Sequence, residues 1–270
     1  VAPSEKATVK WLLASPRGAA AKERVSFAYA ICASPTGNFP SPRCEGPVLG
    51  SGSGNTTADD DGLIAVEIDT PPGAAVGDAK ELLMLSAFCV DETPSTIALD
   101  ARSFEATCSV ATAKTLLGSV NLHVRPAPGA AETDNDNPAI DTGDILLDGQ
   151  VLGAPRACTP DVPVILSNAG ERTLVFHFHD EQRQIASAAQ NTRESLVLSH
   201  VVTAGELDRQ YSALDPEEPA PKDVEIKWTP PGAEEVPADG TSRLVDILFI
   251  LRDGRGGTAF ARRAVCVKRP

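Results

Sequence analysis

The chain has 270 residues, of which 37 are Asp or Glu and 24 are Lys or Arg, so its formal net charge is −13 at pH 7. A surface this acidic repels phosphate backbones and anionic lipid, which argues against nucleic-acid binding and against membrane docking through a basic patch. The length suits two domains of about 100–150 residues. The 21 Gly and 22 Pro favour many turns over long helices.

The first half alternates short apolar segments with turn-forming residues. The clearest segment is Val25 to Cys32, where Val25, Phe27, Tyr29 and Ile31 occupy alternate positions and would share one face of a strand. The glycine–serine run at 50–54 is interpreted as a flexible surface loop, because no lysine or helix follows it. Further strands are predicted at 8–13, 63–68, 82–90 and 116–124. This spacing predicts an all-β sandwich.

A change in composition separates the two halves. Residues 125–138 contain Pro, Gly and a run of Asp and Asn, with little apolar content. Such a segment is typical of a linker. We therefore predict an N-terminal β-sandwich domain at 1–128, a linker at 129–138 and a second domain at 139–270.

The second half carries the more regular pattern. Leu174, Phe176 and Phe178 alternate with more polar positions, and strands are also predicted at 195–202 and 224–228. The chain then shows an apolar run at 244–251, the turn Arg252–Gly257 and a second apolar run at 260–267. This order predicts a terminal β-hairpin. The strand count suits one immunoglobulin-type sandwich, so the predicted fold class is two immunoglobulin-like antiparallel sandwiches in tandem.

The six cysteines are even in number, and none lies in a C-x-x-C arrangement. Closely spaced pairs are usual at zinc sites, so disulfides are the better interpretation, and they imply an oxidising compartment. We expect Cys158 to pair with Cys266. Four cysteines in the first half allow three pairings, of which we favour Cys32–Cys44 and Cys89–Cys108 because each brackets one connection between neighbouring strands.

The chain shows no segment that could cross a membrane. Its longest wholly apolar run, Ile247 to Leu251, is far shorter than the ~20 residues that a bilayer requires. The chain begins at Val1 without a signal-like stretch, so we expect any export signal to have been removed. A lipid anchor upstream of Val1 is left open. The expected location is extracytoplasmic: secreted, periplasmic or associated with the outer membrane.

Several segments of the second half resemble a known module. They are Glu194–Leu196, Thr203–Asp208, Lys227–Pro231 and Leu251–Gly257, with an opening formed by Asn137–Ile140 and Leu147–Gly149. Together they resemble bacterial PKD-like and immunoglobulin-like domains, most of all those of poorly characterised secreted lipoproteins of myxobacteria. The resemblance covers roughly residues 137–267 and implies an extracytoplasmic adhesive, scaffolding or structural module. His200 departs from it, because such domains often carry an aromatic residue there.

Two groups of residues have the chemistry of metal ligands. Asp134, Asp136 and Asp141 offer the hard oxygens that calcium prefers, although the spacing is not that of an EF-hand. The alternative is a solvated acidic linker whose Asp and Asn residues cap turns. His177 and His179 project to the same side of one strand and could share a metal, but two exposed histidines are the plainer interpretation.

The turn residues Arg252, Asp253 and Arg255 are candidates for ligand recognition, although Asp and Gly are also the residues that a hairpin connection needs. Arg262, Arg263, Lys268 and Arg269 are interpreted as solvated sheet surface. No catalytic motif is visible, so no catalytic residue and no cofactor other than calcium is predicted.

We expect a non-catalytic structural or accessory subunit that contacts other envelope or extracellular proteins, including copies of itself. The alternative is a surface-attached module that binds a ligand in a calcium- or carbohydrate-dependent way. A carbohydrate platform would need the chain's few large polar aromatics, which are Trp11, Tyr29, Tyr211 and Trp228.

Overall fold

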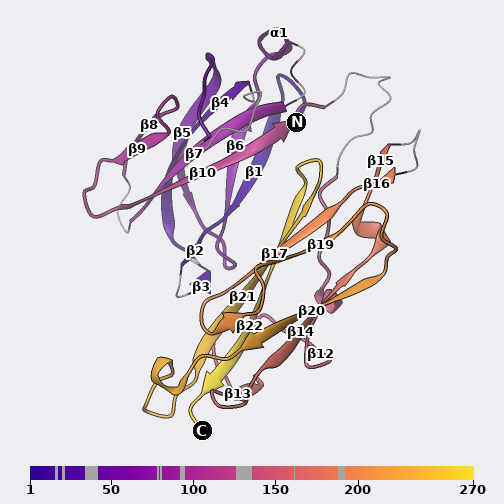
Figure 1. Ribbon diagram of the computed structural model, residues 1–270. Coiled ribbons are helices and arrows are strands. Elements are labelled where there is room, and N and C mark those ends of the chain that lie inside the picture. The colour runs from indigo at the N-terminus through magenta and orange to yellow at the C-terminus, as the bar shows by residue number, and fades with distance from the viewer. Residues whose placement is uncertain are drawn as a thin grey trace. The chain divides into compact units, whose positions relative to one another are not determined.

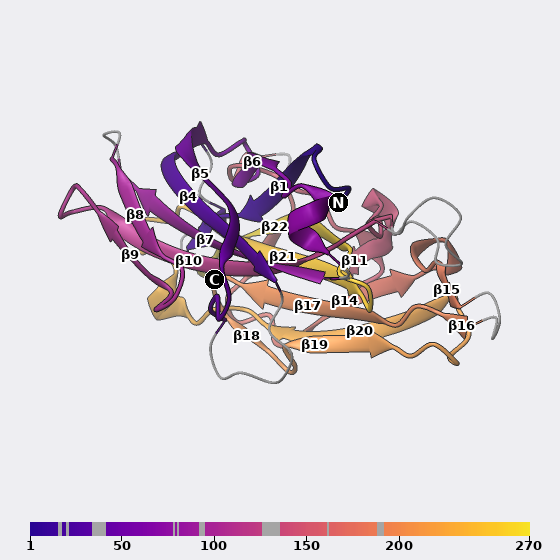
Figure 2. The ribbon, with the colours of Figure 1, turned by 90° about the horizontal axis from the view of Figure 1, so that it is seen from above.

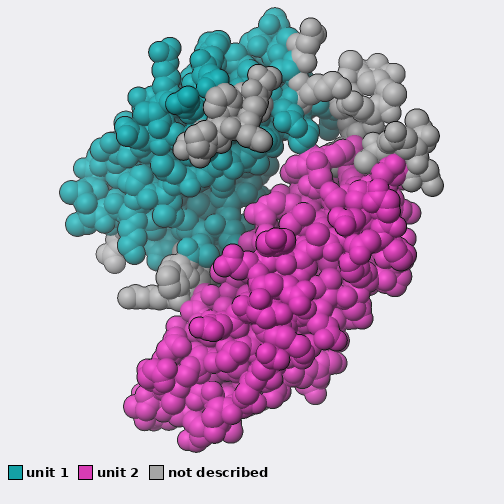
Figure 3. Space-filling view, in the orientation of Figure 1, with its two compact units in different colours: residues 1–14, 19–134 teal, residues 15–18, 135–270 magenta. Residues whose placement is uncertain are grey.

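A computed structural model describes residues 1–15, 18–19, 22–33, 42–77, 79, 81–91, 95–125, 136–160, 162–187 and 192–270. The fold is all-β, as predicted, with two immunoglobulin-like sandwiches in tandem (Figure 1). Residues 1–14 and 19–134 form unit 1, and residues 15–18 and 135–270 form unit 2 (Figure 3). Most of the expected linker at 129–138 lies outside the described residues.

Unit 1 is built on an antiparallel sheet of four strands in the order β10-β7-β4-β5, faced by the two-stranded sheet β1-β6. The four-stranded sheet contains β4 (Arg24–Ala33), β5 (Val48–Thr57), β7 (Glu81–Val90) and β10 (Lys114–His123). The smaller sheet contains β1 (Lys6–Leu12) and β6 (Leu63–Asp69). The remaining elements are β2 (Ala14–Ser15), β3 (Gly18–Ala19), α1 (Gly73–Val76), β8 (Ile97–Asp100) and β9 (Glu105–Cys108).

Both faces of the four-stranded sheet are buried. The expected face of β4, with Tyr29 and Ile31, packs with Ile64 and Val66 of β6 in the larger core. The opposite face, with residues such as Ala30 and Leu85, forms a second, smaller core. Hairpin β8–β9 contributes Leu99 to that core and lies beside β10 (Figure 2). A strand buried on both faces is apolar without alternation, and β7 accordingly reads Glu-Leu-Leu-Met-Leu-Ser-Ala-Phe-Cys-Val.

The glycine–serine run at 50–54 is not a loop, so that prediction was wrong. It lies within β5, where Gly52 pairs with Tyr29 and Gly54 with Phe27 on β4. A Cβ on Gly52 would come within 2.7 Å of the Tyr29 ring. The glycines therefore make room for aromatic rings that lie across the neighbouring strand, and pairing with β4 supplies the order that the sequence alone does not suggest.

Unit 2 consists of two five-stranded sheets that enclose one core. The first sheet has the order β12-β11-β14-β20-β18 and the second the order β13-β22-β21-β17-β19. The first contains β11 (Ile145–Leu147), β12 (Gln150–Val151), β14 (Arg172–Phe178), β18 (Glu206–Leu207) and β20 (Lys222–Thr229). The second contains β13 (Val164–Leu166), β17 (Leu196–Val202), β19 (Tyr211–Leu214), β21 (Arg243–Asp253) and β22 (Thr258–Lys268).

Short elements connect these strands. They are three 3-10 turns, η1 (Thr142–Asp144), η2 (Asp180–Gln182) and η3 (Ala233–Glu235), and the pair β15 (Ile185–Ser187) and β16 (Thr192–Arg193). Pairing is antiparallel between the strands of unit 2 except for β13, which runs parallel to β22.

The core of unit 2 follows the predicted alternation. Leu174, Phe176 and Phe178 are fully buried between the sheets, and Phe176 stacks on Phe249 of the opposite sheet at 6.2 Å between ring centroids. Trp228 is also fully buried, and its indole N–H donates to the Ala204 carbonyl at 3.2 Å. A buried indole needs such a partner, because an unpaired N–H away from water is costly.

Candidate functional site

Three disulfides join the cysteines in the favoured pairing: Cys32–Cys44, Cys89–Cys108 and Cys158–Cys266. No described cysteine is free. The first two bonds close short loops of unit 1, with sequence separations of 12 and 19, whereas the third spans 108 residues of unit 2. The thiols are therefore structural, and none of these cysteines is available as a nucleophile or a metal ligand.

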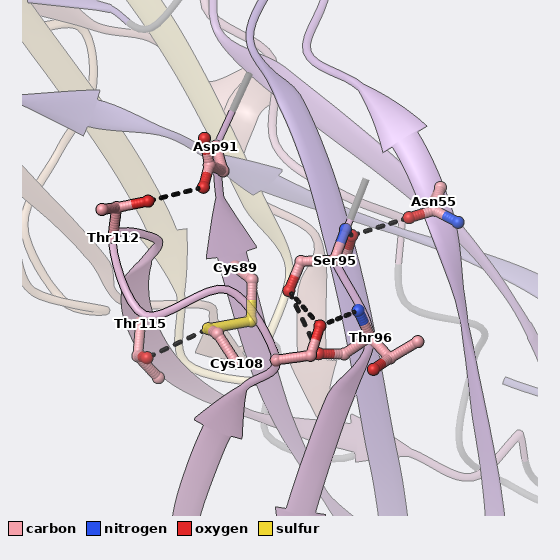
Figure 4. The surroundings of a disulfide bond; sticks show 10 residues. Asn55, Cys89, Asp91, Ser95, Thr96, Cys108, Thr112 and Thr115 are labelled. Carbon is pink, nitrogen blue, oxygen red and sulfur yellow. Dashed lines mark hydrogen bonds between the residues drawn. A yellow bond between two sulfur atoms is a disulfide. The ribbon is translucent and has the colours of Figure 1, made fainter. Parts of the chain in front are cut away.

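Hydroxyl groups surround the Cys89–Cys108 bond (Figure 4). Thr115 Oγ1 lies 3.1 Å from Cys108 Sγ, and Thr112 Oγ1 donates to the Asp91 carboxylate at 3.2 Å. Ser109 accepts a hydrogen bond from the Thr96 N–H at 2.9 Å. The Thr115 contact joins β9 to β10, the Thr96 bond closes the base of the β8–β9 hairpin, and the Thr112 bond joins the segments beside β7 and β10, so this polar cluster serves the fold.

The turn after β21 uses the predicted recognition residues for internal contacts. The Asp253 carboxylate is buried and accepts from the N–H groups of Arg255 and Gly257, at 2.8 and 2.7 Å. The Arg255 guanidinium pairs with buried Glu194 and donates to Gln184 at 2.7 Å. Arg252 is the more exposed of the three and donates to Ser199 at 3.0 Å. A recognition role for this turn stays a prediction.

His177 lies on β14 and His179 directly follows that strand as the N-cap of η2, with ring centroids 6.3 Å apart. Each imidazole is paired with a different carboxylate: His177 with Asp223 on β20, and His179 with buried Asp144 at 2.9 Å. Asp144 also accepts from Gln182 and from the Asp141 N–H. These pairs give both histidines a structural role. In the described parts of the chain, no three His, Cys, Asp or Glu side chains gather as a metal site would require.

The three aspartates predicted for calcium are placed only in part. Asp134 lies outside the described residues. Asp136 exchanges two hydrogen bonds with Gln184, at 3.1 and 2.9 Å, and Asp141 caps the turn η1. Calcium binding at these residues stays a prediction.

Two arginines interpreted as solvated surface are buried, so that interpretation was wrong. Arg262 pairs with Asp246 and donates to the carbonyls of Ala154 and Pro155, at 3.3 and 2.9 Å. Arg263 donates to the carbonyls of Arg262 and Asp141, and burial lowers the pKa of its guanidinium. The segment before Cys158 covers this part of β22, and no local sequence pattern predicts that contact, because the two segments are more than 100 residues apart in the chain.

His200, the position where PKD-like domains often carry an aromatic residue, is a buried ionisable side chain. It lies on β17 opposite Phe249 and is 1% exposed, with no hydrogen-bond partner for either ring nitrogen among the described residues. Burial lowers the pKa of His200, since water no longer solvates the imidazolium, although the nearby backbone of Arg209 and the charge of Asp208 oppose the change.

The four candidate platform aromatics do not form one surface. Tyr29 and Trp228 are buried, and Trp11 packs over Gly118 and edge-on to Phe88 at 5.5 Å. Tyr211, on the edge strand β19, is 69% exposed. These positions argue against a stacked platform for sugars.

One edge of the four-stranded sheet of unit 1, strand β10, carries adjacent exposed leucines. Strand β10 is ten residues long, and β7 is the strand beside it in the sheet. Its register with β7 is unbroken, and residues 115–122 carry no charge and no proline. Leu116 and Leu117 on this strand are 39% and 46% exposed. Charges, prolines and bulges are the usual protection of an edge, and this stretch has none of them.

Comparisons with known proteins give the chain no family. No protein-family model matches it, and no curated protein matches it. Among solved structures it is similar to the periplasmic chaperone SfaE, with 7% identity and a TM-score of 0.31 over 46% of this chain and 57% of that chain. It is also similar to the D0-D1 domain of intimin, with 10% identity and a TM-score of 0.22 over 98% of this chain and 93% of that chain.

The chain therefore spans little more than half the length of SfaE. Likenesses at these TM-scores carry no argument about function, and the fold assignment rests on the sheets themselves. Among the helices in the described residues, none has the length and apolar character of a membrane-spanning segment.

Proposed function

We propose that this chain is a non-catalytic structural or accessory protein of an extracytoplasmic compartment that acts through protein–protein contacts. The observation that carries the proposal is that the cysteines and most of the candidate site residues make contacts within the fold. All six cysteines are in disulfides, and the candidate turn residues and histidines are mostly engaged in internal pairs. The exposed parts of the described residues include sheet surface and sheet edge, which are suited to binding another protein.

The location is argued from the disulfides. Three bonds in one chain persist where thiols are oxidised, which favours the cell surface, the periplasm or the medium over the cytosol. Labelling free thiols in the native envelope tests this location: we expect no labelled cysteine, and labelling of the unreduced protein would contradict an oxidising compartment.

The contact role can be tested in the native envelope with a photo-crosslinker placed at Tyr211, which is exposed on the edge strand β19. A matched control carries the same crosslinker at exposed Glu206, on the other sheet of unit 2. We expect discrete crosslinked products that depend on the probe's position. Absence of any crosslinked product from both positions, and from a third probe at exposed Leu117, would overturn the proposal.

The alternative function is ligand binding that depends on calcium or carbohydrate, and the acidic residues favour the calcium-dependent form. Asp136 and Asp141 lie in the segment that opens unit 2, and carboxylates there could bind a divalent ion with Asp134. A titration with calcium should then raise the melting temperature of unit 2, and Asp136→Asn should reduce that rise. An unchanged melting temperature at millimolar calcium removes this rival.

A further inference from the structure

Hydrogen bonds at the end of β10 indicate which of its residues face the free edge of the sheet. The Val1 amine donates to the His123 carbonyl at 2.5 Å, and the Arg125 N–H donates to the Val1 carbonyl at 2.6 Å. The His123 carbonyl thus points away from β7, and alternate residues of a strand point their N–H and C=O groups to the same side. The backbone groups of Thr115, Leu117, Ser119 and Asn121 accordingly face the open edge.

In the described parts of the chain, no strand covers that stretch. Val1 pairs beside Val124, beyond the stretch, and β9 contacts β10 near its start. Among the described residues, these four therefore present backbone donors and acceptors in a line without a partner strand, and the side chains of Leu117 and of the intervening Leu116 are exposed. Such an edge has a strong tendency to add a strand.

We propose that this edge binds β10 of a second copy of the chain, in antiparallel orientation, so that two four-stranded sheets join into one of eight strands. This inference rests on the proposed role in protein–protein contact and names one partner. The charge of this edge permits a second copy: the chain carries −13, yet residues 115–122 carry no charge, so paired β10 strands place no like charges opposite each other. An uncharged edge also cannot select a partner by charge.

The strand is suited to two-fold pairing. A two-fold axis through Gly118 places Thr115 opposite Asn121 and Leu117 opposite Ser119, which uses all four outward-facing residues and makes about eight hydrogen bonds. On the core-facing side, Leu116 meets Val120. Gly118 lies on the axis, where the strands approach most closely. The Trp11 ring occupies the space that a side chain of residue 118 would need, since a Cβ there would lie 2.6 Å from Trp11 Cζ3.

An edge-to-edge contact buries less surface than a stable dimer interface, so we expect a weak dimer that forms with rising concentration. Sedimentation of the oxidised full chain should show the average mass rising from monomer toward dimer. Leu117→Lys with Ser119→Lys places lysines opposite each other and should hold the chain as a monomer. The same positions changed to Glu should do likewise, and a mixture of the Lys and Glu variants should recover the dimer.

The matched control is Ser51→Lys with Ser53→Lys, which changes two exposed positions on β5, the opposite edge of the same sheet. It should dimerise like the unmodified chain. A wild-type chain that stays monomeric up to millimolar concentration, or a dimer that survives both Lys substitutions on β10, overturns the inference. Crosslinking to other proteins in the envelope would still support the proposed function in that case, so the two failures can be told apart.

Discussion

The two units use their sheets differently. Unit 2 packs two sheets around one core, and strands such as β14 and β17 alternate between buried and more exposed positions, whereas β21 and β22 are buried over most of their length. Unit 1 buries both faces of one sheet, with a larger core on one side and a smaller one beneath the β8–β9 hairpin on the other. Alternation is therefore the signature of a strand with one buried face, and a continuous apolar run such as β7 is the signature of a strand with two.

The disulfides follow the same division. In unit 2 one bond joins Cys158, before the first long strand, to Cys266 in the last strand, so it closes almost the whole unit. In unit 1 each bond holds a short connection against the sheet, and Cys32 and Cys44 belong to the smaller core. Loop length thus predicts that the two units lose different amounts of stability on removal of a disulfide.

The largest expected effect comes from removing the long-range bond. Cys158→Ala with Cys266→Ala should lower the free energy of unfolding of unit 2 by about 4–5 kcal/mol, whereas Cys32→Ala with Cys44→Ala should cost unit 1 about 3 kcal/mol. Each unit contains one tryptophan, Trp11 or Trp228, so denaturant unfolding followed by fluorescence separates the units. Trp11→Phe provides the signal of unit 2 alone. Equal losses would show that loop length does not set the difference.

A smaller effect is expected from filling the space beneath an aromatic ring of unit 1. Gly52→Val should destabilise unit 1 by about 1–3 kcal/mol, because the new side chain displaces the Tyr29 ring from the sheet. Ser53→Val on the same strand is the control, since that position is exposed and a β-branched residue suits a strand. Thermal melting distinguishes them. A neutral Gly52→Val would mean that Tyr29 can move without loss.

The smallest effect is a pH dependence confined to unit 2. His200 is neutral in the folded chain at a pH where the unfolded chain begins to bind a proton, because burial lowers its pKa. Stability should therefore fall as pH drops below about 6.5, by at most about 1.4 kcal/mol per pH unit. His200→Phe should remove that slope. Denaturant unfolding at about six pH values between about 5 and 7.5 would measure it.

A slope that is unchanged in His200→Phe would assign the pH dependence to groups other than His200. His200→Leu serves as the second variant, because a larger phenylalanine could strain the core beside Phe249. Both variants should abolish the slope if His200 carries it.

Much of the fold could be predicted in segments where the spacing of apolar side chains determines the secondary structure. The alternation of Leu174, Phe176 and Phe178 predicted a strand and its buried face, and the apolar runs around the turn Arg252–Gly257 predicted the terminal hairpin. The pairing of the cysteines was also predicted, because short separations favour bonds within one connection. The short strands β8, β9, β18 and β19 escaped prediction, since two to four residues are too few to show a period.

The candidate sites were less predictable, because their character depends on what covers them. Asp253 and Arg255 have the sequence of an exposed turn, yet Asp253 is buried and Arg255 is engaged by Glu194, 61 residues away in the chain. The open edge of β10 is likewise invisible in the sequence, because strand order in a sheet depends on long-range pairing.

Local spacing and composition were enough to predict the fold class, the use of the cysteines in disulfides and the buried face of strands such as β14. Three features became visible only in the folded chain: the glycine run at 50–54 is a strand under two aromatic rings, Arg262 and Arg263 are buried, and β10 ends its sheet. The physical reason is the same in each case: burial and hydrogen bonding at these residues come from segments far away in the chain.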